Sequence, residues 1–277
     1  MNPSAVTHQL EVPGASIYYE VRGSGPLLAL IAAPMGSSGF AALAELMASH
    51  YTVVTYDPRG SERTTVTDRT EITTPELLAE DVHRVLNRVS DEPAAILGSS
   101  GGAVTGLALV TAHPEQVSVL VAHEPPLLTL LSNADEELAE VQEIYQTYLR
   151  AGSDAAMRRF LLSIGVLGEE GSRRFAAMPE PDPVPAPAVP ETDNDFFYAS
   201  QIRATTGYRP DLKALSEAST KIVVGVGATS AGQLAHRGGQ ALAEHLGLTA
   251  TEFPGDHGGF AGETPAFAER LRQVLAD

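Results

Sequence analysis

Two adjacent serines within a run of small residues give this chain its clearest chemical signal. Residues 98–102 read Gly-Ser-Ser-Gly-Gly and follow the apolar run Ala94–Gly98. The pentapeptide matches Gly-x-Ser-x-Gly, a strand-to-helix turn in which the middle serine is exposed as a nucleophile. Ser100 is therefore the candidate nucleophile. It would lie at the N-terminus of a helix running to about His113, where the helix dipole favours developing negative charge.

Three other interpretations of this glycine-rich stretch fit less well. A flexible linker is disfavoured because the flanking segments are apolar and periodic. A phosphate-binding loop requires G-x-x-x-x-G-K-[ST], and no lysine follows here. A dinucleotide loop requires G-x-G-x-x-G, and the spacing of Gly98, Gly101, Gly102 and Gly106 differs from it.

A serine hydroxyl needs a general base near neutral pH, and His257 is the best placed of the eight histidines. It lies in the loop "PGDHGGF", after the last expected strand, and this loop leaves the same carboxyl edge of the sheet as Ser100. The alternative role for His257 is to cap the final helix. His123 ends a strand and could line the site, while the other histidines are expected at chain ends or on helices.

The segments that must position these residues alternate between strand and helix patterns. The expected strands are Ser16–Gly23, Pro26–Ala33, Tyr51–Tyr56, Ala94–Gly98, Val117–His123, Lys221–Gly227 and Thr249–Phe253. The expected helices include Phe40–His50, Pro75–Val89 with Thr74 as its N-cap, Gln233–Leu246 and Pro265–Leu275. This alternation predicts an α/β protein with a mostly parallel sheet.

The alternation stops between His123 and Lys221. Helical patterns cover Asp135–Gly152 and Asp154–Gly165, and the proline-rich segment Pro179–Pro190 is expected to be exposed polyproline II. We therefore predict an inserted helical cap over residues 125–213. Residues 1–124 and 214–277 would form the core.

Composition restricts the partners and the location. The net charge of −17 disfavours nucleic acid and anionic membrane surfaces. The absence of cysteine excludes disulfides and thiolate zinc sites. Because no signal peptide or membrane-spanning run is evident, we expect a cytoplasmic protein. The expected partner is a small-molecule substrate, and a homodimer is left open.

The combined motifs resemble the α/β-hydrolase superfamily over nearly the full chain. The turn "GSSGG", the loop "GDHGGF", the segment "YDPRGSER" after a strand and the cap after the sixth strand follow the superfamily's order. The resemblance implies an eight-stranded, mostly parallel sheet flanked by helices. "HEPPLL" and "YRPDLKAL" resemble a group of small hydrolases within the superfamily. Asp57 and Arg59 are expected to stabilise their loop.

The resemblance also implies an oxyanion hole built from two backbone N–H groups. One belongs to Gly101, directly after the nucleophile. Many relatives carry His-Gly-x after the third strand, where this chain has Ile31-Ala32-Ala33-Pro34-Met35. Since Pro34 has no N–H, aligning it with the proline that often follows that motif makes Ala33 the second donor. Met35 is the alternative donor and an expected substrate contact.

The acid of the expected triad is harder to assign. The usual position after the seventh strand reads Gly-Ala-Thr229-Ser230 and has no carboxylate. Some members of the superfamily carry the acid after the sixth strand, where this chain has Glu124. Glu124 is therefore the candidate, with two alternatives: a purely structural Glu124, or a Ser-His dyad helped by Thr229, Ser230 or water. Asp256 is a poor candidate because its side chain should diverge from that of the adjacent His257.

These features predict a serine hydrolase of a small, fairly apolar ester or lactone, acting through an acyl-enzyme. No metal and no organic cofactor is implied. The alternatives on the same site are C–C bond hydrolysis, acyl transfer and perhydrolysis. A non-catalytic ligand-binding protein of the same fold is a further alternative, favoured by the missing acid at Thr229 and the altered His-Gly position.

Overall fold

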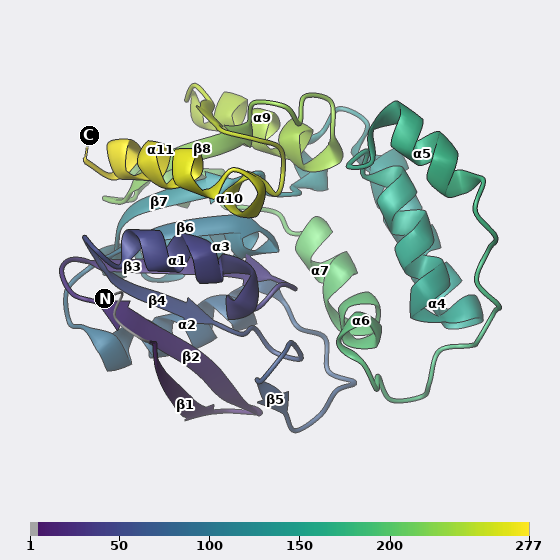
Figure 1. The fold of residues 1–277 in the computed structure, drawn as a ribbon, viewed down its shortest axis with the longest axis horizontal. Helices are drawn as coiled ribbons and strands as arrows, with labels where there is room; N and C mark the ends of the chain where they lie inside the picture. The colour runs from purple at the N-terminus through teal and green to yellow at the C-terminus, as the bar shows by residue number, and fades with distance from the viewer. Residues whose placement is uncertain (1–4, 277) are drawn as a thin grey trace.

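The computed structural model describes residues 5–276 and has one mixed sheet covered by helices on both faces (Figure 1). Within these residues the strands follow the order β1-β2-β4-β3-β6-β7-β8-β9, and β5 pairs with β2. The strands are β1 Val6–Val12, β2 Ala15–Gly23, β3 Leu27–Ala33, β4 Thr52–Tyr56, β5 Thr65–Val66, β6 Ala94–Ser100, β7 Val117–His123, β8 Lys221–Gly227 and β9 Thr251–Phe253. The predicted α/β class with a mostly parallel sheet is confirmed.

The sheet of the described residues has nine strands, where eight were expected. Two of them, β1 and β5, were not among the seven segments identified as strands in the sequence, and the two residues of β5 pair with Ala15 and Ser16 of β2. A two-residue strand is too short to show an alternating pattern, which is why sequence analysis missed it. The pairs formed by β2 with β1, β4 and β5 are antiparallel, and the path from β4 through β3 to β9 is parallel.

Helices pack on each face of the sheet because side chains alternate along its strands. In β3, Leu27, Ala29 and Ile31 join one buried cluster, and Leu28 and Leu30 join the other. The first cluster includes α2 (Pro75–Val89), α3 (Gly101–Ala112), α8 (Leu212–Glu217) and α9 (Leu234–Leu246), and the second includes α1 (Ala41–Met47) and α11 (Thr264–Ala276). The parallel strands therefore lie between two apolar layers, and their carboxyl ends meet at one edge.

The expected helix boundaries agree closely with the structure. Helix α2 has the predicted bounds, and the Thr74 hydroxyl caps it by accepting a hydrogen bond from the Leu77 N–H at 3.3 Å. Helix α1 is shorter than expected, because Phe40 belongs to a 3₁₀ turn, Ser37–Phe40, and residues 48–50 form a turn after Met47. No helix among residues 5–276 combines the length and apolar character needed to cross a bilayer.

The segment between β7 and β8 contains mainly helices, as expected. We call its helical part the α4–α7 segment: α4 Ala134–Ser163, α5 Gly168–Ala176, α6 Asp193–Phe196, a π-helical turn Phe197–Gln201 and α7 Ile202–Thr206. Helix α4 is broken at Gly152, whose φ of 83° and ψ of 179° are not helical. The break explains why the sequence predicted two helices here.

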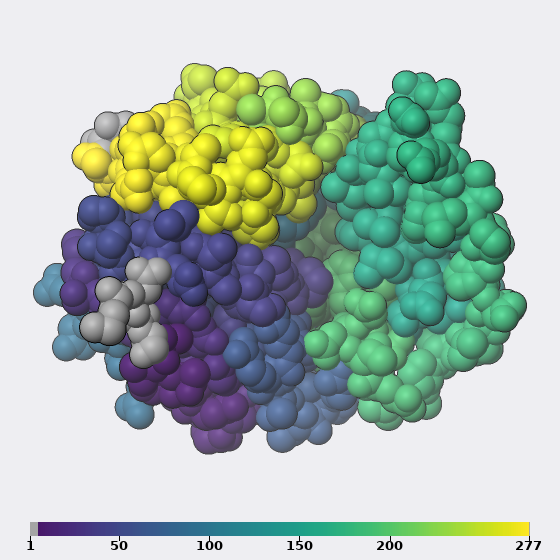
Figure 2. All heavy atoms as spheres, viewed as in Figure 1, coloured from purple at the N-terminus to yellow at the C-terminus, as the bar shows by residue number. Residues whose placement is uncertain are grey.

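The α4–α7 segment lies beside the carboxyl edge of the sheet (Figure 1). In the space-filling view, a hollow separates its teal surface from the yellow surface of the last two helices (Figure 2). The proline-rich residues 179–190 that link α5 to α6 contain neither helix nor strand, and most of their side chains are exposed. The remaining short helix, α10 Gly259–Gly262, follows β9.

Candidate active site

Ser100 lies at the sharp turn that joins β6 to α3. Its φ of 55° and ψ of −123° are unusual for a residue with a side chain and carry a conformational cost. The turn depends on small neighbours. A Cβ at Gly98 would lie 2.6 Å from the carbonyl oxygen of Gly102, and a Cβ at Gly102 would lie 2.2 Å from that of Ile31. The strained backbone and the glycine spacing are those expected of a nucleophile turn.

The two candidate oxyanion donors lie beside Ser100. Ala33 is paired with Ser100 across β3 and β6. A Cβ at Gly101 would lie only 2.5 Å from the Ala33 carbonyl oxygen, so these two backbones are in close contact. Gly101 is the first residue of α3, and its N–H therefore has no acceptor within the helix. Ala33, Gly101 and the other expected contact, Met35, all line one cavity with Ser100.

His257 lies across this cavity and is bonded to Glu124. The distance from His257 Nδ1 to Glu124 Oε2 is 2.7 Å, although the residues are 133 positions apart in the chain. A carboxylate only accepts hydrogen bonds, so Nδ1 carries the hydrogen. Nε2 is then the ring nitrogen left for other partners. Glu124 is fully buried, whereas His257 is partly exposed at the cavity wall.

Glu124 remains ionised although it is buried. Burial acts to raise its pKa, but hydrogen bonds from His257, Ser230 and the Gly227 N–H outweigh this and hold the pKa at about 2. The Gly227 N–H donates to Glu124 Oε1 at 2.9 Å, and the Ser230 hydroxyl donates to the same oxygen. The backbone of Glu124 has a φ of 50°, a further sparsely populated conformation at this edge of the sheet.

Thr229, Asp256 and the second histidine, His123, do not contact His257 through a hydrogen bond to its ring. Thr229 is exposed, and Asp256 accepts a hydrogen bond from the Gly258 N–H of its own loop at 2.8 Å. His123 is fully buried at the end of β7, with its ring edge-on to Phe253 and Phe267, and does not line the cavity.

The protonation state of His123 follows from this position. Its two ring nitrogens have no hydrogen-bond partner among the described residues. Burial lowers its pKa to about 4, so the ring is neutral at physiological pH.

The cavity has a volume of about 320 Å³ and lies between the core and the α4–α7 segment. Its wall on the α4–α7 side is mainly aliphatic and aromatic. Contributing side chains are Val141, Ile144, Met157, Phe160, Phe197 and Ile202. Two acidic side chains on this wall, Glu137 and Glu140, are each paired with an arginine at 2.7 Å, Arg237 and Arg159 respectively. The cavity therefore offers apolar surface, with its acidic groups compensated.

The profile of the alpha/beta hydrolase fold family matches residues 25–221. The chain belongs to this family. It is 34% identical over 281 residues to the uncharacterized hydrolase YraK of Bacillus subtilis, and the alignment covers 96% of this chain and 94% of that protein. Ser100, Glu124 and the Ala33 turn lie within the family match, while His257 lies beyond its end.

Solved structures of this fold superpose over nearly the whole chain. A hydrolase from Pseudomonas aeruginosa PA01 has a TM-score of 0.73 at 23% identity and covers 98% of both chains. A thermophilic esterase from Thermogutta terrifontis has a TM-score of 0.72 at 15% identity, covering 99% of this chain and 98% of that one. At these identities the similarity establishes the fold, and the chemistry must be argued from the site.

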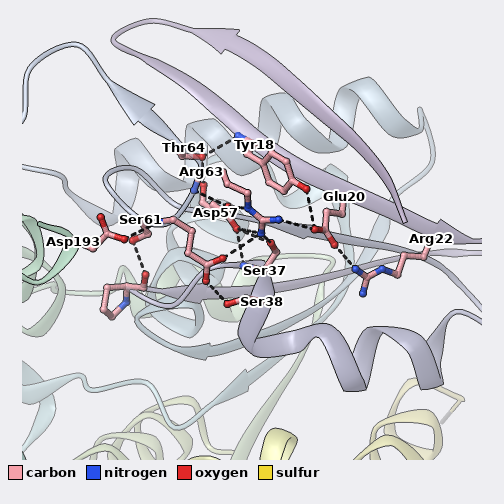
Figure 3. Close-up of polar contacts among 12 residues, drawn as sticks. Tyr18, Glu20, Arg22, Ser37, Ser38, Asp57, Ser61, Arg63, Thr64 and Asp193 are labelled. Carbon is pink, nitrogen blue, oxygen red and sulfur yellow. Dashed lines mark hydrogen bonds and ion pairs between the residues drawn. The ribbon is translucent and has the colours of Figure 1, made fainter. Parts of the chain in front are cut away.

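A network of polar side chains supports the turn that carries Ala33 (Figure 3). Asp57, at the end of β4, is fully buried and accepts hydrogen bonds from the Ser37 N–H at 2.8 Å and the Ser37 hydroxyl at 2.6 Å. The Ser61 hydroxyl donates to the Pro34 carbonyl oxygen at 2.6 Å. These bonds hold residues 34–37, the continuation of β3, against the loop that follows β4.

Arg63 connects this network to the antiparallel part of the sheet. Its Nε donates to Asp57 Oδ2 at 2.9 Å, and its Nη1 donates to Glu20 Oε1 at 3.1 Å (Figure 3). The same loop also contacts the α4–α7 segment, because the Glu62 N–H donates to Asp193 Oδ2 at 2.8 Å. Arg59 instead forms a buried ion pair with Asp81 at 2.6 Å. Asp57 and Arg59 thus both stabilise this loop, as the sequence suggested.

His236 is the residue of this site that sequence reasoning missed. It lies in the first turn of α9, and its Nδ1 is 3.1 Å from the Ser230 hydroxyl. His236 was expected on a helix, and nothing in the neighbouring sequence gave a reason to single it out. The available signal was position: α9 begins just after the loop that leaves β8 at the same edge as Glu124, so the first turn of the helix must lie near that edge.

Proposed function

We propose that this chain is a serine hydrolase that cleaves a small, fairly apolar carboxylic ester or lactone through an acyl-enzyme. The observation that carries the proposal is the 2.7 Å contact between His257 Nδ1 and Glu124 Oε2, with His257 facing the cavity that Ser100 also lines. This contact orients the base and leaves its second nitrogen for the nucleophile. The cavity lies between the core and the α4–α7 segment, which belongs to the cap that we propose for residues 125–213.

In the first half-reaction, Ser100 Oγ attacks the acyl carbonyl carbon as its proton passes to His257 Nε2. The carbonyl oxygen becomes an oxyanion, for which Ala33 and Gly101 would supply backbone N–H donors. The dipole of the twelve-residue helix α3 points its positive end toward the same place. Collapse of the intermediate breaks the bond to the leaving oxygen, which takes the proton from His257 and departs as the alcohol.

In the second half-reaction, water attacks the acyl-enzyme and gives its proton to His257. The new oxyanion uses the same two donors. Its collapse returns the proton to Ser100 Oγ and releases the carboxylic acid. Glu124, with a pKa of about 2, remains a carboxylate throughout and stabilises the imidazolium formed in each half.

Ionised Glu124 beside His257 also bears on the alternative of a non-catalytic binding protein. That alternative drew support from the missing carboxylate at Thr229. The 2.7 Å contact of ionised Glu124 with His257 supports Glu124 as the orienting acid and so weakens the argument from a missing carboxylate. Acyl transfer and perhydrolysis would use the same acyl-enzyme with a different acceptor. For any of these reactions, the apolar wall of the cavity favours an uncharged substrate over a charged one.

The test is hydrolysis of p-nitrophenyl esters of increasing acyl length, with the Ser100→Ala variant as control. We expect saturable turnover that depends on Ser100, together with labelling of Ser100 by a fluorophosphonate. Ester turnover at the same rate in the Ser100→Ala variant would refute the nucleophile. A protein that neither turns over esters nor reacts with the fluorophosphonate would instead support the binding-protein alternative.

A further inference from the structure

The two oxygens of Glu124 have separate partners. Oε2 accepts the hydrogen bond from His257 Nδ1 at 2.7 Å. Oε1 accepts from the Gly227 N–H at 2.9 Å and from the Ser230 hydroxyl. Beyond Ser230 lies His236, whose Nδ1 is 3.1 Å from the Ser230 Oγ and 3.5 Å from Glu124 Oε1. One buried carboxylate therefore has an imidazole on each side, and only one of them is in direct contact with it.

The direction of the hydrogen bonds follows from the available protons. The Ser230 hydroxyl has a single hydrogen and two acceptors nearby, Glu124 Oε1 and the Gly227 carbonyl oxygen at 3.0 Å. The charged carboxylate is the stronger acceptor and can only accept, so this hydrogen points to Oε1. The Ser230 oxygen then presents a lone pair to His236 Nδ1. Nδ1 of His236 must therefore carry a hydrogen, either in the neutral Nδ1–H tautomer or in the imidazolium.

His236 would compete for Glu124 if the hydroxyl were absent. Its Nδ1 lies 3.5 Å from Oε1, and without the Ser230 oxygen as acceptor a movement of well under 1 Å would bring it into hydrogen-bond distance. The side chain of His236 is 14% exposed and that of Glu124 is fully buried, so such a contact would be little screened by solvent. A carboxylate shared between two imidazoles would stabilise each imidazolium less than it stabilises one alone.

We propose that Ser230 is a positioning residue whose hydroxyl separates His236 from Glu124 and so reserves the carboxylate for His257. The inference rests on the proposed function, because it assigns a role within the same triad. Ser230 contacts no reacting atom and acts through Glu124. The residue next to Thr229, the usual position of the acid, thus holds the acid that follows β7.

The pH dependence of activity must be interpreted with all the titratable groups around Glu124 and His236 in mind. His257 lies on the other carboxylate oxygen, and His123 precedes Glu124 at the end of β7. On α9 itself, Arg237 is paired with Glu137 of α4 at 2.7 Å. Of these groups, His257 is the proposed base, His123 is neutral because burial lowers its pKa to about 4, and the Arg237–Glu137 pair is compensated.

The deciding experiment compares Ser230→Ala, Ser230→Thr, His236→Asn and the Ser230→Ala/His236→Asn double variant on one p-nitrophenyl ester. Ser230→Ala should lower kcat about 10-fold with little change in KM, the scale on which loss of an outer hydrogen bond that orients an active group acts. The acid limb of its kcat/KM profile should move to lower pH, since the His257 imidazolium is less stabilised. Ser230→Thr keeps the hydroxyl and should retain most of the activity.

The double variant separates positioning from simple damage. Removing the competing imidazole should restore most of the kcat that Ser230→Ala loses, and His236→Asn alone should lose less than Ser230→Ala. Thr229→Ala removes the hydroxyl of the exposed neighbouring residue and serves as the matched control, with wild-type behaviour expected. A Ser230→Ala enzyme with unchanged kcat and pH profile would overturn the proposal, as would a double variant no better than Ser230→Ala.

A measurement without substrate keeps this inference distinct from the proposed function. The strongly hydrogen-bonded Nδ1–H of His257 should give a downfield proton resonance in the resting protein, absent in a His257→Gln variant. The resonance should move upfield in Ser230→Ala and return in the double variant. Loss of Ser100 dependence in the ester assay would refute the proposed function, whereas an unmoved resonance in Ser230→Ala would refute only the role of Ser230.

Discussion

On the core side of the cavity the candidate catalytic groups are held by buried hydrogen bonds, whereas the α4–α7 side presents mainly aliphatic and aromatic side chains. Glu124 on the core side is fully buried and bonded through both oxygens. On the opposite wall, Ile144 and Phe197 contribute shape but no polar atoms, and the acidic groups there are paired with arginines. The two sides thus differ in what a substitution removes.

The difference between the two sides indicates which residues should control substrate binding and which should control the chemical step. Hydrogen bonds on the core side fix groups relative to the reacting atoms, so their loss should appear mainly in kcat. Apolar contacts on the α4–α7 side act on substrate and transition state alike, so their loss should appear mainly in KM and in selectivity. Each of the following changes tests that division.

The largest effect is expected from Ser100→Ala. Removing the nucleophile should reduce kcat by roughly 10⁴-fold or more, as for other serine triads, because no acyl-enzyme can form. Folding should be unaffected, since the strained turn depends on its glycines rather than on the hydroxyl. The measurement is kcat and KM on one ester, with Ser99→Ala as the control that should be nearly silent. A small effect on kcat would place the chemistry elsewhere.

Glu124→Gln should produce the next largest loss. The amide is uncharged and cannot stabilise the imidazolium, so we expect kcat/KM to fall by at least about 10²-fold, within the limit of about 10⁴-fold known for an orienting acid. Thr229→Asp, at the usual position of the acid, should change little because Thr229 is exposed. Full activity in Glu124→Gln would make Glu124 structural and favour a Ser-His dyad.

How far the sequence predicts this site depends on how local each signal is. Ser100 and His257 carry their signals within a few residues: a glycine-bounded turn after an apolar run, and a glycine-rich loop after the last strand. The partner of His257 could not be decided locally. The carboxylate could come from the loop after β7 or from the loop after β8. Which of them contacts His257 depends on how the ends of these two strands lie relative to the loop after β9, and the periodicity of the sequence does not encode this.

The sheet and most helices could be predicted because buried strands and amphipathic helices have distinct periods. One alternating segment, Val6–Val12, was nevertheless not identified as a strand. The other exceptions were features without a period. Strand β5 has two residues, and the role of His236 depends on the side-chain direction in the first turn of α9. The polar network around Asp57 and Arg63 also joins four segments distant in the chain, so the sequence suggested only its residue types and not its partners (Figure 3).

His123 tests whether burial on the core side has a cost in stability. Its pKa is about 4 in the folded protein and about 6.5 unfolded, so the unfolded chain binds the proton first as the pH falls. The free energy of unfolding should therefore drop between pH 6.5 and 4 by roughly 3 kcal/mol on this account, and stay constant at higher pH. His123→Leu should remove this part of the drop. Urea unfolding at several pH values measures it, and identical pH dependences of the two proteins would contradict it.

Asp57→Asn should lower kcat by less than Ser100→Ala or Glu124→Gln does. The amide can still accept from Ser37 but loses the charge that pairs with Arg63, so residues 34–37 should be held less firmly. Since Ala33 precedes this turn, we expect kcat to fall about 10-fold with KM little changed, less than the 10²–10³-fold typical when an oxyanion donor is removed. Asp68→Asn, an exposed aspartate bonded to Thr70 in its own turn, is the control. A change confined to KM would place Asp57 outside the support of the oxyanion donors.

The smallest effect is expected on the opposite wall, from Ile144→Val. Ile144 is 1% exposed, belongs to the buried cluster of the α4–α7 segment and lines the cavity. Removing one methyl group lengthens the apolar space by about one carbon. The preference among esters of increasing acyl length should therefore shift toward the longer chain by about 10-fold in the ratio of kcat/KM values, the lower end of the range for the contribution of one methylene in an apolar pocket. The shift should come from KM, with kcat on the best ester nearly constant.

Leu149→Val on the exposed side of the same helix is the matched control, because it also removes one carbon but does not change the cavity. If Ile144→Val lowered kcat equally for all chain lengths, the α4–α7 segment would be positioning the catalytic groups as well, and the division between the two sides would fail.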